Sequence, residues 1–282
     1  MTERADAHIH LFEGGYQGGS FAHRPGVTLD EAQLYESLAK EHAVHTALVV
    51  CYEGQRWAAG NNDHVGALTS QHAWIRPVAF VDPAHPPSIG QLQQWQANRF
   101  VGISLYILTQ EDVDAVGSVP DSIWSWIADH RWLVSVNSRG AMWSAWPAIL
   151  RRHEGLRIVL SHVGLPPAVD TAPSPADAAR NLRDVIALAR FPGPRVKLSG
   201  FYALTQPRYD YPHRNAWPYV ETLLTSYGSQ RLVWGSDFSP SLDAVTFPQT
   251  LGLFSKMPFL SPADRQAIEG GNLLALVDET VS

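Results

Sequence analysis

The run DAHIHLF, residues 6–12, places His8 and His10 two positions apart inside an apolar sequence. Residues two apart on a β-strand point to the same side, so these two imidazoles can face one site. With a third histidine or a carboxylate they would form a ligand set for Zn²⁺ or a similar cation, leaving one coordination position open for water. Histidines on an ordinary strand are more often exposed to solvent, or hydrogen-bonded to neighbours, than bound to a metal. The choice between these interpretations depends on which other side chains the fold brings to the pair.

Two candidate partners end later apolar runs: His162 in the segment LSHVG and Asp237 in the segment WGSDFS. A cation held by such residues would lower the pKa of a bound water toward about 7 and polarise a carbonyl group. Asp237 could then take a proton from the water and pass it to the leaving group. Each residue also has a simpler interpretation, because His162 could be a hydrogen-bonded core histidine and Asp237 could belong to an ordinary turn.

The composition excludes several classes of protein. The net charge is −6 and no dense Lys/Arg cluster is present, so we expect no nucleic-acid partner. The sequence lacks both an apolar run of membrane-spanning length and a basic-then-apolar leader, which predicts a soluble, cytoplasmic protein without a membrane partner. The single cysteine, Cys51, excludes an intramolecular disulfide and a cysteine-based structural zinc site. A monomer and a homo-oligomer are both compatible with this sequence, and the expected partner is a small-molecule substrate.

Eight short apolar runs alternate with amphipathic stretches, and they predict eight buried parallel strands. A helix is predicted over residues 28–42, with Thr28 as N-cap and Glu31 as its capping-box partner. Ser-Pro pairs open the stretches 174–190 and 261–272, where proline suits the first helical turn. The predicted strands are residues 5–12, 45–53, 75–82, 100–107, 132–138, 157–164, 195–202 and 231–239.

This alternation over about 250 residues matches a (β/α)8 TIM barrel of class α/β, which we expect to form a single domain over residues 1–282. A doubly wound open sheet is the competing fold. It usually has fewer strands and a glycine-rich first turn, which the segment HLFEGGYQGG resembles only loosely.

In a TIM barrel the catalytic groups come from the C-terminal ends of the strands and the loops that follow. Strand eight lies beside strand one, so Asp237 is expected next to His8 and His10. Lys197 lies on a buried strand and needs a carboxylate or a substrate to offset the loss of hydration, so either an internal ion pair or a substrate contact would explain it. The side chains expected at the mouth as substrate-binding candidates are those of Glu53, Tyr106, Asn137, Arg139, Lys197 and Tyr202.

Tryptophans add a further candidate feature. Trp57, Trp143 and Trp217 fall in loops on the expected active face. Their rings would suit the face of a sugar or an aromatic ligand, or they would simply pack the loops together.

Four motifs in this order, DAHIHLF, VLSHVGLP, VKLSG and VWGSDFS, resemble the amidohydrolase superfamily. The resemblance is closest to its amidohydrolase-2 branch, which includes sugar lactonases, pyrone-dicarboxylate lactonases and metal-dependent decarboxylases. It spans nearly the whole chain, and the final GGNLLAL matches a Gly-Asn helix start of that branch. The resemblance implies that His8, His10, His162 and Asp237 hold one divalent ion, with zinc the first choice. In relatives that work without a metal, it implies that Asp237 activates water while the histidines polarise the carbonyl.

Two departures from the family pattern narrow the expectation. Strand five reads VSVNSRG, with Asn137 where many metal-dependent relatives carry a lysine or histidine ligand, so a two-metal centre is not expected. Strand four carries Ser104 and Tyr106 where pyrone-dicarboxylate lactonases typically have an arginine that binds a substrate carboxylate. A dicarboxylate substrate is therefore not expected.

The leading hypothesis is a hydrolase that opens a small cyclic ester, a lactonase, with Asp237 as general base and His162 as a second catalytic residue. The alternative is a metal-dependent, non-oxidative decarboxylase of an aromatic or unsaturated acid, in which Asp237 protonates carbon. The absent strand-five ligand makes this alternative weaker. A third hypothesis is a catalytically silent barrel that binds a ligand.

Overall fold

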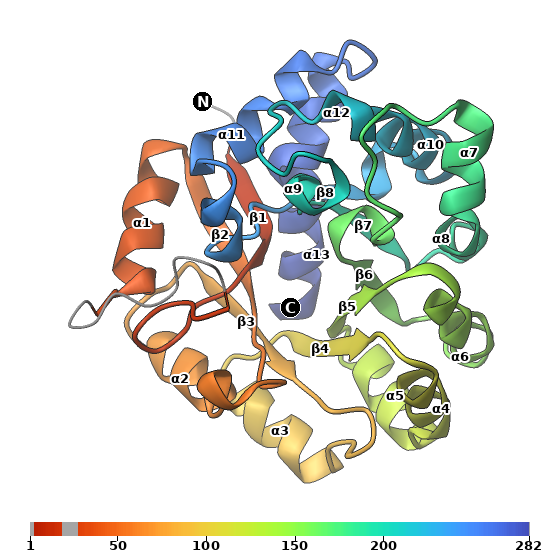
Figure 1. Ribbon diagram of the computed structural model, residues 1–282. Helices are drawn as coiled ribbons and strands as arrows, with labels where there is room; N and C mark the ends of the chain where they lie inside the picture. The colour runs from red at the N-terminus through yellow and green to blue at the C-terminus, as the bar shows by residue number, and fades with distance from the viewer. Residues whose placement is uncertain (1–2, 19–27, 282) are drawn as a thin grey trace.

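The structure is a computed structural model, and it describes residues 3–18 and 28–281. Eight parallel strands form one sheet in the order β1 to β8, each pairing with the next in sequence. Figure 1 shows the strands around a central axis with helices outside them. The (β/α)8 barrel predicted from the sequence is confirmed. The strands are β1 (Arg4–Ile9), β2 (Val44–Val50), β3 (Ile75–Phe80), β4 (Gly102–Ile107), β5 (Leu133–Ser138), β6 (Arg157–Leu160), β7 (Arg195–Leu198) and β8 (Leu232–Trp234).

The helices lie in the connections and after the last strand. None of those in the two described ranges is both long enough and apolar enough to cross a membrane. The helices are α1 (Glu31–Glu41), α2 (Asn61–Leu68), α3 (Ile89–Ala97), α4 (Gln110–Ser118), α5 (Asp121–Asp129), α6 (Trp146–Arg152), α7 (Pro175–Asn181), α8 (Arg183–Leu188), α9 (Phe201–Leu204), α10 (Trp217–Tyr227), α11 (Phe247–Gly252), α12 (Pro262–Gln266) and α13 (Asn272–Val281).

Two of the three predicted helix starts are confirmed and one is wrong. Ser174 and Ser261 are N-caps of α7 and α12, each followed by proline. Helix α1 is instead capped by Asp30, whose carboxylate accepts a hydrogen bond from the backbone of the third helical residue. Thr28 is not the cap because the helix begins at Glu31, two residues later than predicted, and Glu31 is therefore its first residue rather than a capping-box partner. Glu31 turns inward and accepts hydrogen bonds from the backbone N–H groups of the loop after β1.

The barrel closes just beyond the ends of its first and last strands. The backbone N–H of Asp237 donates to the carbonyl of His8 at 2.8 Å, and that of His10 donates to the carbonyl of Phe238. A parallel bridge joins Ile9 to Phe238. The predicted proximity of strand eight and strand one is therefore confirmed, and these bonds place Asp237 beside both histidines.

Several strands end earlier than the sequence predicted. The runs 157–164, 195–202 and 231–239 leave the sheet after Leu160, Leu198 and Trp234. Their last residues bend over the C-terminal edge of the sheet, and these bends carry several of the predicted site residues.

A bulge interrupts β1. Between Asp6 and Ile9 this strand advances three residues, while β2 advances only two, from Ala47 to Val49. One extra residue in a strand reverses the side to which the later side chains point. The side chains of β1 that come before the bulge therefore contact different neighbours from those that come after it.

Apolar side chains and α13 close the floor of the barrel, at the N-terminal end of the strands. Before the bulge, Ala5 and Ala7 belong to this floor, whereas His8 and His10 beyond it face the mouth. Figure 1 shows α13 behind the sheet, near the centre of the view. The buried residues of the floor are Ala5, Ala7, Leu48, Val50, Val78, Val101, Leu133, Val159, Val233, Leu273, Leu276 and Val277.

Candidate active site

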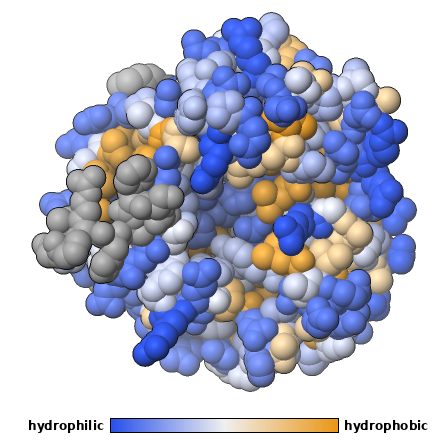
Figure 2. All heavy atoms as spheres, in the orientation of Figure 1, coloured by the Kyte–Doolittle hydropathy of each residue, from blue (hydrophilic) through white to orange (hydrophobic). Residues whose placement is uncertain are grey.

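A cavity of about 270 Å³ opens at the C-terminal ends of the strands. Figure 2 shows this face of the molecule hollowed near its middle. A larger cavity, about 430 Å³, lies elsewhere between Arg76, Arg99 and Trp132, and it contains none of the predicted site residues. The described residues that line the mouth cavity are His10, Phe12, Tyr16, Gly18, Tyr52, Gln55, Trp57, Tyr106, Asn137, His162, Tyr202, Asp237 and Pro240.

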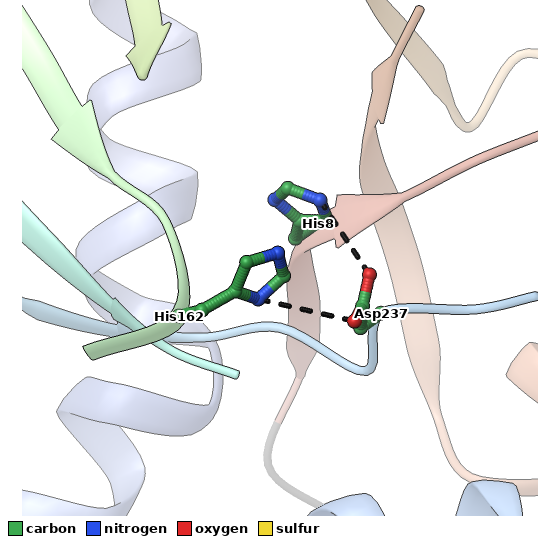
Figure 3. A group of neighbouring side chains, drawn as sticks. All are labelled: His8, His162 and Asp237. Atoms are coloured by element: carbon green, nitrogen blue, oxygen red, sulfur yellow. Dashed lines mark ion pairs between the residues drawn. The ribbon is translucent and has the colours of Figure 1, made fainter. Parts of the chain in front are cut away.

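Asp237 is the centre of a buried polar cluster. Its Oδ1 lies 3.6 Å from Nε2 of His8 and 3.8 Å from Nε2 of His10, and its Oδ2 lies 3.8 Å from Nδ1 of His162. Figure 3 shows His8, His162 and Asp237 pointing toward one another. Tyr202 donates a 2.6 Å hydrogen bond to Oδ2 of Asp237. The carboxylate is thus oriented by a phenol on one side and surrounded by imidazoles on the other.

The histidines have further fixed partners. Nδ1 of His10 lies 2.6 Å from the carbonyl oxygen of Val50, and Nε2 of His10 lies 3.1 Å from Nε2 of His8. The hydroxyl of Ser199 accepts from the backbone N–H of His162 and lies 3.0 Å from its Nδ1. If this hydroxyl donates to Nδ1, the other ring nitrogen of His162 carries the proton.

Burial sets the charge of the cluster, because removal from water disfavours the charged form of each group. It lowers the pKa of His10 to about 4 and that of His162 to about 3, and it lowers the pKa of His8 well below its ordinary value. Burial also raises the pKa of Asp237 to about 6, opposed by His10, the Tyr202 hydrogen bond and Lys197. At neutral pH the cluster is therefore one carboxylate among neutral imidazoles.

Asp6 holds β1 against β8 beneath this cluster. Its carboxyl accepts hydrogen bonds from the backbone N–H groups of His8 and Ser236 and from the hydroxyl of Tyr35. Burial raises the pKa of Asp6 to about 7, although these hydrogen bonds act in the opposite direction. The carboxyl supports the bulged strand and does not line the cavity.

Two residues of the cluster have an unusual backbone conformation. The φ angles of His162 and Asp237 are 52° and 58°, in the left-handed region that non-glycine residues seldom adopt. This conformation turns the chain sharply after β6 and after β8. It is the local reason that both predicted strands end early and that both side chains reach into the mouth.

With this geometry in view, comparison with known proteins identifies the family. A family model described as amidohydrolase matches residues 5–277. The chain belongs to the amidohydrolase family. An L-fucono-1,5-lactonase from Burkholderia ambifaria is 31% identical over 134 residues, which cover 45% of this chain and 44% of that enzyme. The matched region is thus less than half the length of that relative.

Solved structures of other amidohydrolase-like proteins share the fold over their full lengths. An amidohydrolase from Burkholderia multivorans with bound zinc has a TM-score of 0.79 at 21% identity, covering 98% of this chain and 99% of that one. A putative 2-pyrone-4,6-dicarboxylic acid hydrolase from Pseudomonas putida has a TM-score of 0.73, also at 21% identity, and the match covers 100% of both chains. At such identities these likenesses establish the barrel and no more.

Aromatic rings form two walls of the mouth cavity in this amidohydrolase. On one side Trp57 packs against Phe12 and Tyr16, with ring centroids 4.8 and 5.5 Å apart. On the other side Tyr52 packs against Tyr106 at 4.7 Å. Such surfaces suit the apolar face of a small ring-shaped ligand.

The structure brings together most of the residues predicted from the motifs. His8, His10, His162 and Asp237 meet as described above, and Tyr106, Asn137 and Tyr202 line the cavity. Their roles stay predictions.

Three substrate-binding candidates lie elsewhere than predicted. Glu53 accepts a hydrogen bond from the backbone N–H of Asn62, in the first turn of α2, because its carboxylate satisfies a helix start. Arg139 lies on the exposed surface, one residue past the end of β5. Lys197 is completely buried under His8. Among the described residues, none of these three lines the mouth cavity.

The tryptophan alternatives are also resolved. Trp57 lines the cavity. Trp143 and Trp217 pack loops, donating hydrogen bonds to the carbonyls of Gly164 and Pro212.

Four further cavity residues were not predicted from the sequence: Phe12, Tyr16, Tyr52 and Gln55. Phe12 belongs to the first motif, and Tyr52 follows the second strand almost directly. The rule that strand ends face the mouth would have found both.

The donor atoms of the cluster fit one cation of the zinc type. His8, His162 and Asp237 each offer a ligand atom, and these atoms all lie within 4.8 Å of one another. His10 is a candidate for a fourth donor and third nitrogen, because its Nε2 lies 3.1 Å from Nε2 of His8 and 3.8 Å from Oδ1 of Asp237. Imidazole and carboxylate ligands suit Zn²⁺ and related ions.

Proposed function

We propose that this amidohydrolase hydrolyses a small neutral lactone, with Asp237 as general base. The observation that carries the proposal is a buried carboxylate, oriented by Tyr202, that faces a ring-sized cavity and is surrounded by neutral histidines. A base needs a pKa near the working pH and hydrogen-bond reach to the proton it takes. Asp237, with a pKa of about 6, is ionised at neutral pH and still basic enough to accept a proton.

In the proposed reaction, water in the cavity attacks the carbonyl carbon while Asp237 takes one of its protons. The carbonyl π electrons move to oxygen, and the neutral imidazole of His162, which lines the cavity, donates a hydrogen bond to that oxygen. When the tetrahedral intermediate collapses, the ring C–O bond breaks. Asp237 returns the proton to the departing alkoxide, so the product is a hydroxy acid.

The cavity favours an uncharged substrate. The described residues that line it include no lysine or arginine, and its two histidines are neutral. A substrate carboxylate would lose its hydration there without gaining a cationic partner, which is costly. This argues against a dicarboxylic lactone, whose second carboxylate would find no cationic side chain among the described lining residues.

The family likeness supports the same chemistry. The partial match to an L-fucono-1,5-lactonase favours a sugar-derived lactone, whose ring would lie between the Trp57 and Tyr52 walls. The zinc in the Burkholderia multivorans structure makes zinc the first metal to test. When bound by His8, His10, His162 and Asp237, a divalent ion would supply Lewis-acid polarisation of the carbonyl.

A lactone panel tests the proposal. Wild-type protein is assayed by acid release on neutral sugar lactones, unsubstituted aliphatic lactones and a pyrone dicarboxylate, before and after removal of metal by a chelator. Aromatic acids are assayed in parallel for release of carbon dioxide. We expect turnover of neutral lactones and none of the other two classes. Decarboxylation without lactone hydrolysis would overturn the proposal.

A further inference from the structure

Glu31 is one of three carboxylates buried in the described part of the chain, together with Asp6 and Asp237. Asp237 is the proposed base and Asp6 supports the bulged strand, but the reaction proposed above gives Glu31 no part. It is the first residue of α1, at the helix end where the dipole favours a negative charge. Burial of a charged group still costs free energy unless the group is paired, so its contacts should explain its position.

Both carboxylate oxygens of Glu31 accept hydrogen bonds from the backbone of the loop after β1. Oε2 accepts from the N–H of Phe12 at 2.7 Å, and Oε1 accepts from the N–H of Tyr16 at 2.9 Å. Between these two residues the chain makes a turn, in which the N–H of Gly15 donates to the carbonyl of Phe12. Hydrogen bonds to an ionised acceptor are stronger than those between neutral groups. One carboxylate therefore holds both ends of this loop segment against α1.

The two residues held by Glu31 carry rings of the Trp57 wall, which consists of Phe12, Tyr16 and Trp57. All three line the mouth cavity. The rings of Phe12 and Tyr16 lie 5.8 Å apart, and Trp57 packs against both. On its other side Phe12 stacks on the ring of His10, with centroids 5.7 Å apart. The position of this wall relative to the central cluster thus depends on the backbone that Glu31 holds.

We propose that Glu31 is a positioning residue that sets the Trp57 wall for binding of the substrate ring. This rests on the proposed function for the identity of the ligand, a neutral lactone. Glu31 does not line the mouth cavity among the described residues, so it acts through Phe12 and Tyr16. Its loss weakens binding of the ring, whereas proton transfer at Asp237 is kept. A change that removes only such binding raises KM and leaves kcat nearly unchanged.

The two hydrogen bonds can be tested in the wild-type protein. Backbone N–H groups that are held in buried hydrogen bonds exchange with deuterium more slowly than exposed ones. We expect the N–H groups of Phe12 and Tyr16 to exchange at least about tenfold more slowly than that of the exposed Gln17 in the same loop. Equal rates at the three positions would overturn the proposal, and this holds even if no variant of Glu31 folds.

Glu31→Gln removes the anchor with little change in side-chain shape. Its amide has one acceptor oxygen, so it can serve only one of the two N–H groups and turns its own N–H donors toward the other. The matched control is Glu41→Gln, at the exposed end of the same helix.

The indole N–H signals of the nitrogen-15-labelled proteins report on the wall without a substrate. Trp57→Phe assigns the signal of Trp57, and Trp132→Phe assigns a buried tryptophan directly before β5 as the reference. We expect the Trp57 signal to shift or broaden in Glu31→Gln while the Trp132 signal stays in place. An unmoved Trp57 signal, or an equal change at Trp132, would contradict the proposal.

The kinetic measurement uses a neutral lactone that the wild-type protein hydrolyses. In Glu31→Gln we expect KM to rise about tenfold and kcat to change by less than about threefold, because a ring that is bound less well still meets an intact base. Glu41→Gln should leave both constants unchanged. A fall in kcat at unchanged KM would remove Glu31 from ring binding. If no lactone is hydrolysed, the proposed function fails, whereas the exchange and indole measurements still decide whether Glu31 sets the wall.

Discussion

The floor and the mouth of this barrel are built from the same eight strands, yet their interiors are opposite in chemistry. At the floor, small and branched apolar side chains meet Leu273 and Leu276 of α13 in a closed core. At the mouth, His8, Lys197 and Asp237 are equally buried but polar. Burial of apolar surface stabilises a fold, whereas burial of ionisable groups costs free energy unless they are well paired. The apolar floor therefore stabilises the fold, and part of this free energy offsets the cost of burying ionisable groups at the mouth.

Loss of the base is the largest effect that we expect. Asp237→Asn keeps the shape of the side chain but cannot accept a proton, so kcat/KM on a confirmed lactone should fall by about 10² to 10⁴. Circular dichroism should show an unchanged fold. The control is Asp114→Asn on the exposed face of α4, which should keep full activity. Activity of Asp237→Asn within a few-fold of wild type would remove Asp237 from the mechanism.

A cavity in the floor should show the reverse pattern. Leu273→Ala removes a completely buried side chain from the core under the barrel and should lower the free energy of unfolding by about 2 to 5 kcal/mol. Activity per folded molecule should stay near that of wild type. Urea denaturation measures the loss, and Leu34→Ala, on the partly exposed face of α1, should change stability by less than about 0.5 kcal/mol. A large loss of activity in folded Leu273→Ala would show that floor and mouth are coupled.

The mouth should become more stable when its carboxylate is removed. Burial raises the pKa of Asp237 from 3.8 to about 6, so the folded state holds this proton more tightly than the unfolded state. Wild-type stability therefore declines as pH rises through this window, and the decline is complete above about 6. Asp237→Asn, which is always neutral, should exceed wild type by about 3 kcal/mol at pH near 8 and show little difference near pH 4. Equal stability at both pH values would mean that the carboxylate is better stabilised than its burial indicates.

The smallest expected effect comes from removing the hydroxyl that orients Asp237 while the carboxylate itself is kept. The hydrogen bond from Tyr202 lowers the pKa of Asp237, so Tyr202→Phe should raise it and move the acidic limb of the kcat/KM profile upward by about one pH unit. Activity rises with pH as Asp237 ionises, and the variant should therefore lose most near pH 6 and least near pH 8. Tyr209→Phe, at an exposed position, is the control. An unshifted profile would mean that this hydrogen bond does not tune the base.

The apolar runs predicted the barrel, and the polar residues that end these runs predicted the central cluster. Both features are visible in short segments of the sequence. Apolar runs show where strands lie, and strand order in a barrel then brings the ends of β1 and β8 together, which is why Asp237 and His8 could be paired across the sequence. The bulge in β1 was not predictable from alternation, because it accompanies hydrogen bonds that the Asp6 carboxylate accepts from the backbone N–H groups of His8 and of Ser236, just past β8.

Side chains that follow a strand were harder to place. Glu53 and Arg139 lie within three residues of strand ends, as the cavity-lining residues His162 and Asp237 do, but one caps a helix and the other faces solvent. The burial of Lys197 was predicted, yet its partner was not. That partner is a histidine, whereas the sequence suggested a carboxylate or a substrate. Such contacts depend on tertiary packing that periodicity does not encode.

The left-handed backbone at Asp237 has a consequence for how this family can evolve. An aspartate with a φ of 58° holds a conformation that costs about 1 to 3 kcal/mol and that glycine and asparagine adopt more easily. Replacing Asp237 by either residue would relieve the backbone and remove a buried charge together. With the role proposed above for Asp237, a single mutation would yield a sturdier barrel without turnover, so only continued selection for turnover would keep the aspartate in place. Lineages freed from that selection should accumulate glycine or asparagine here before they lose the fold.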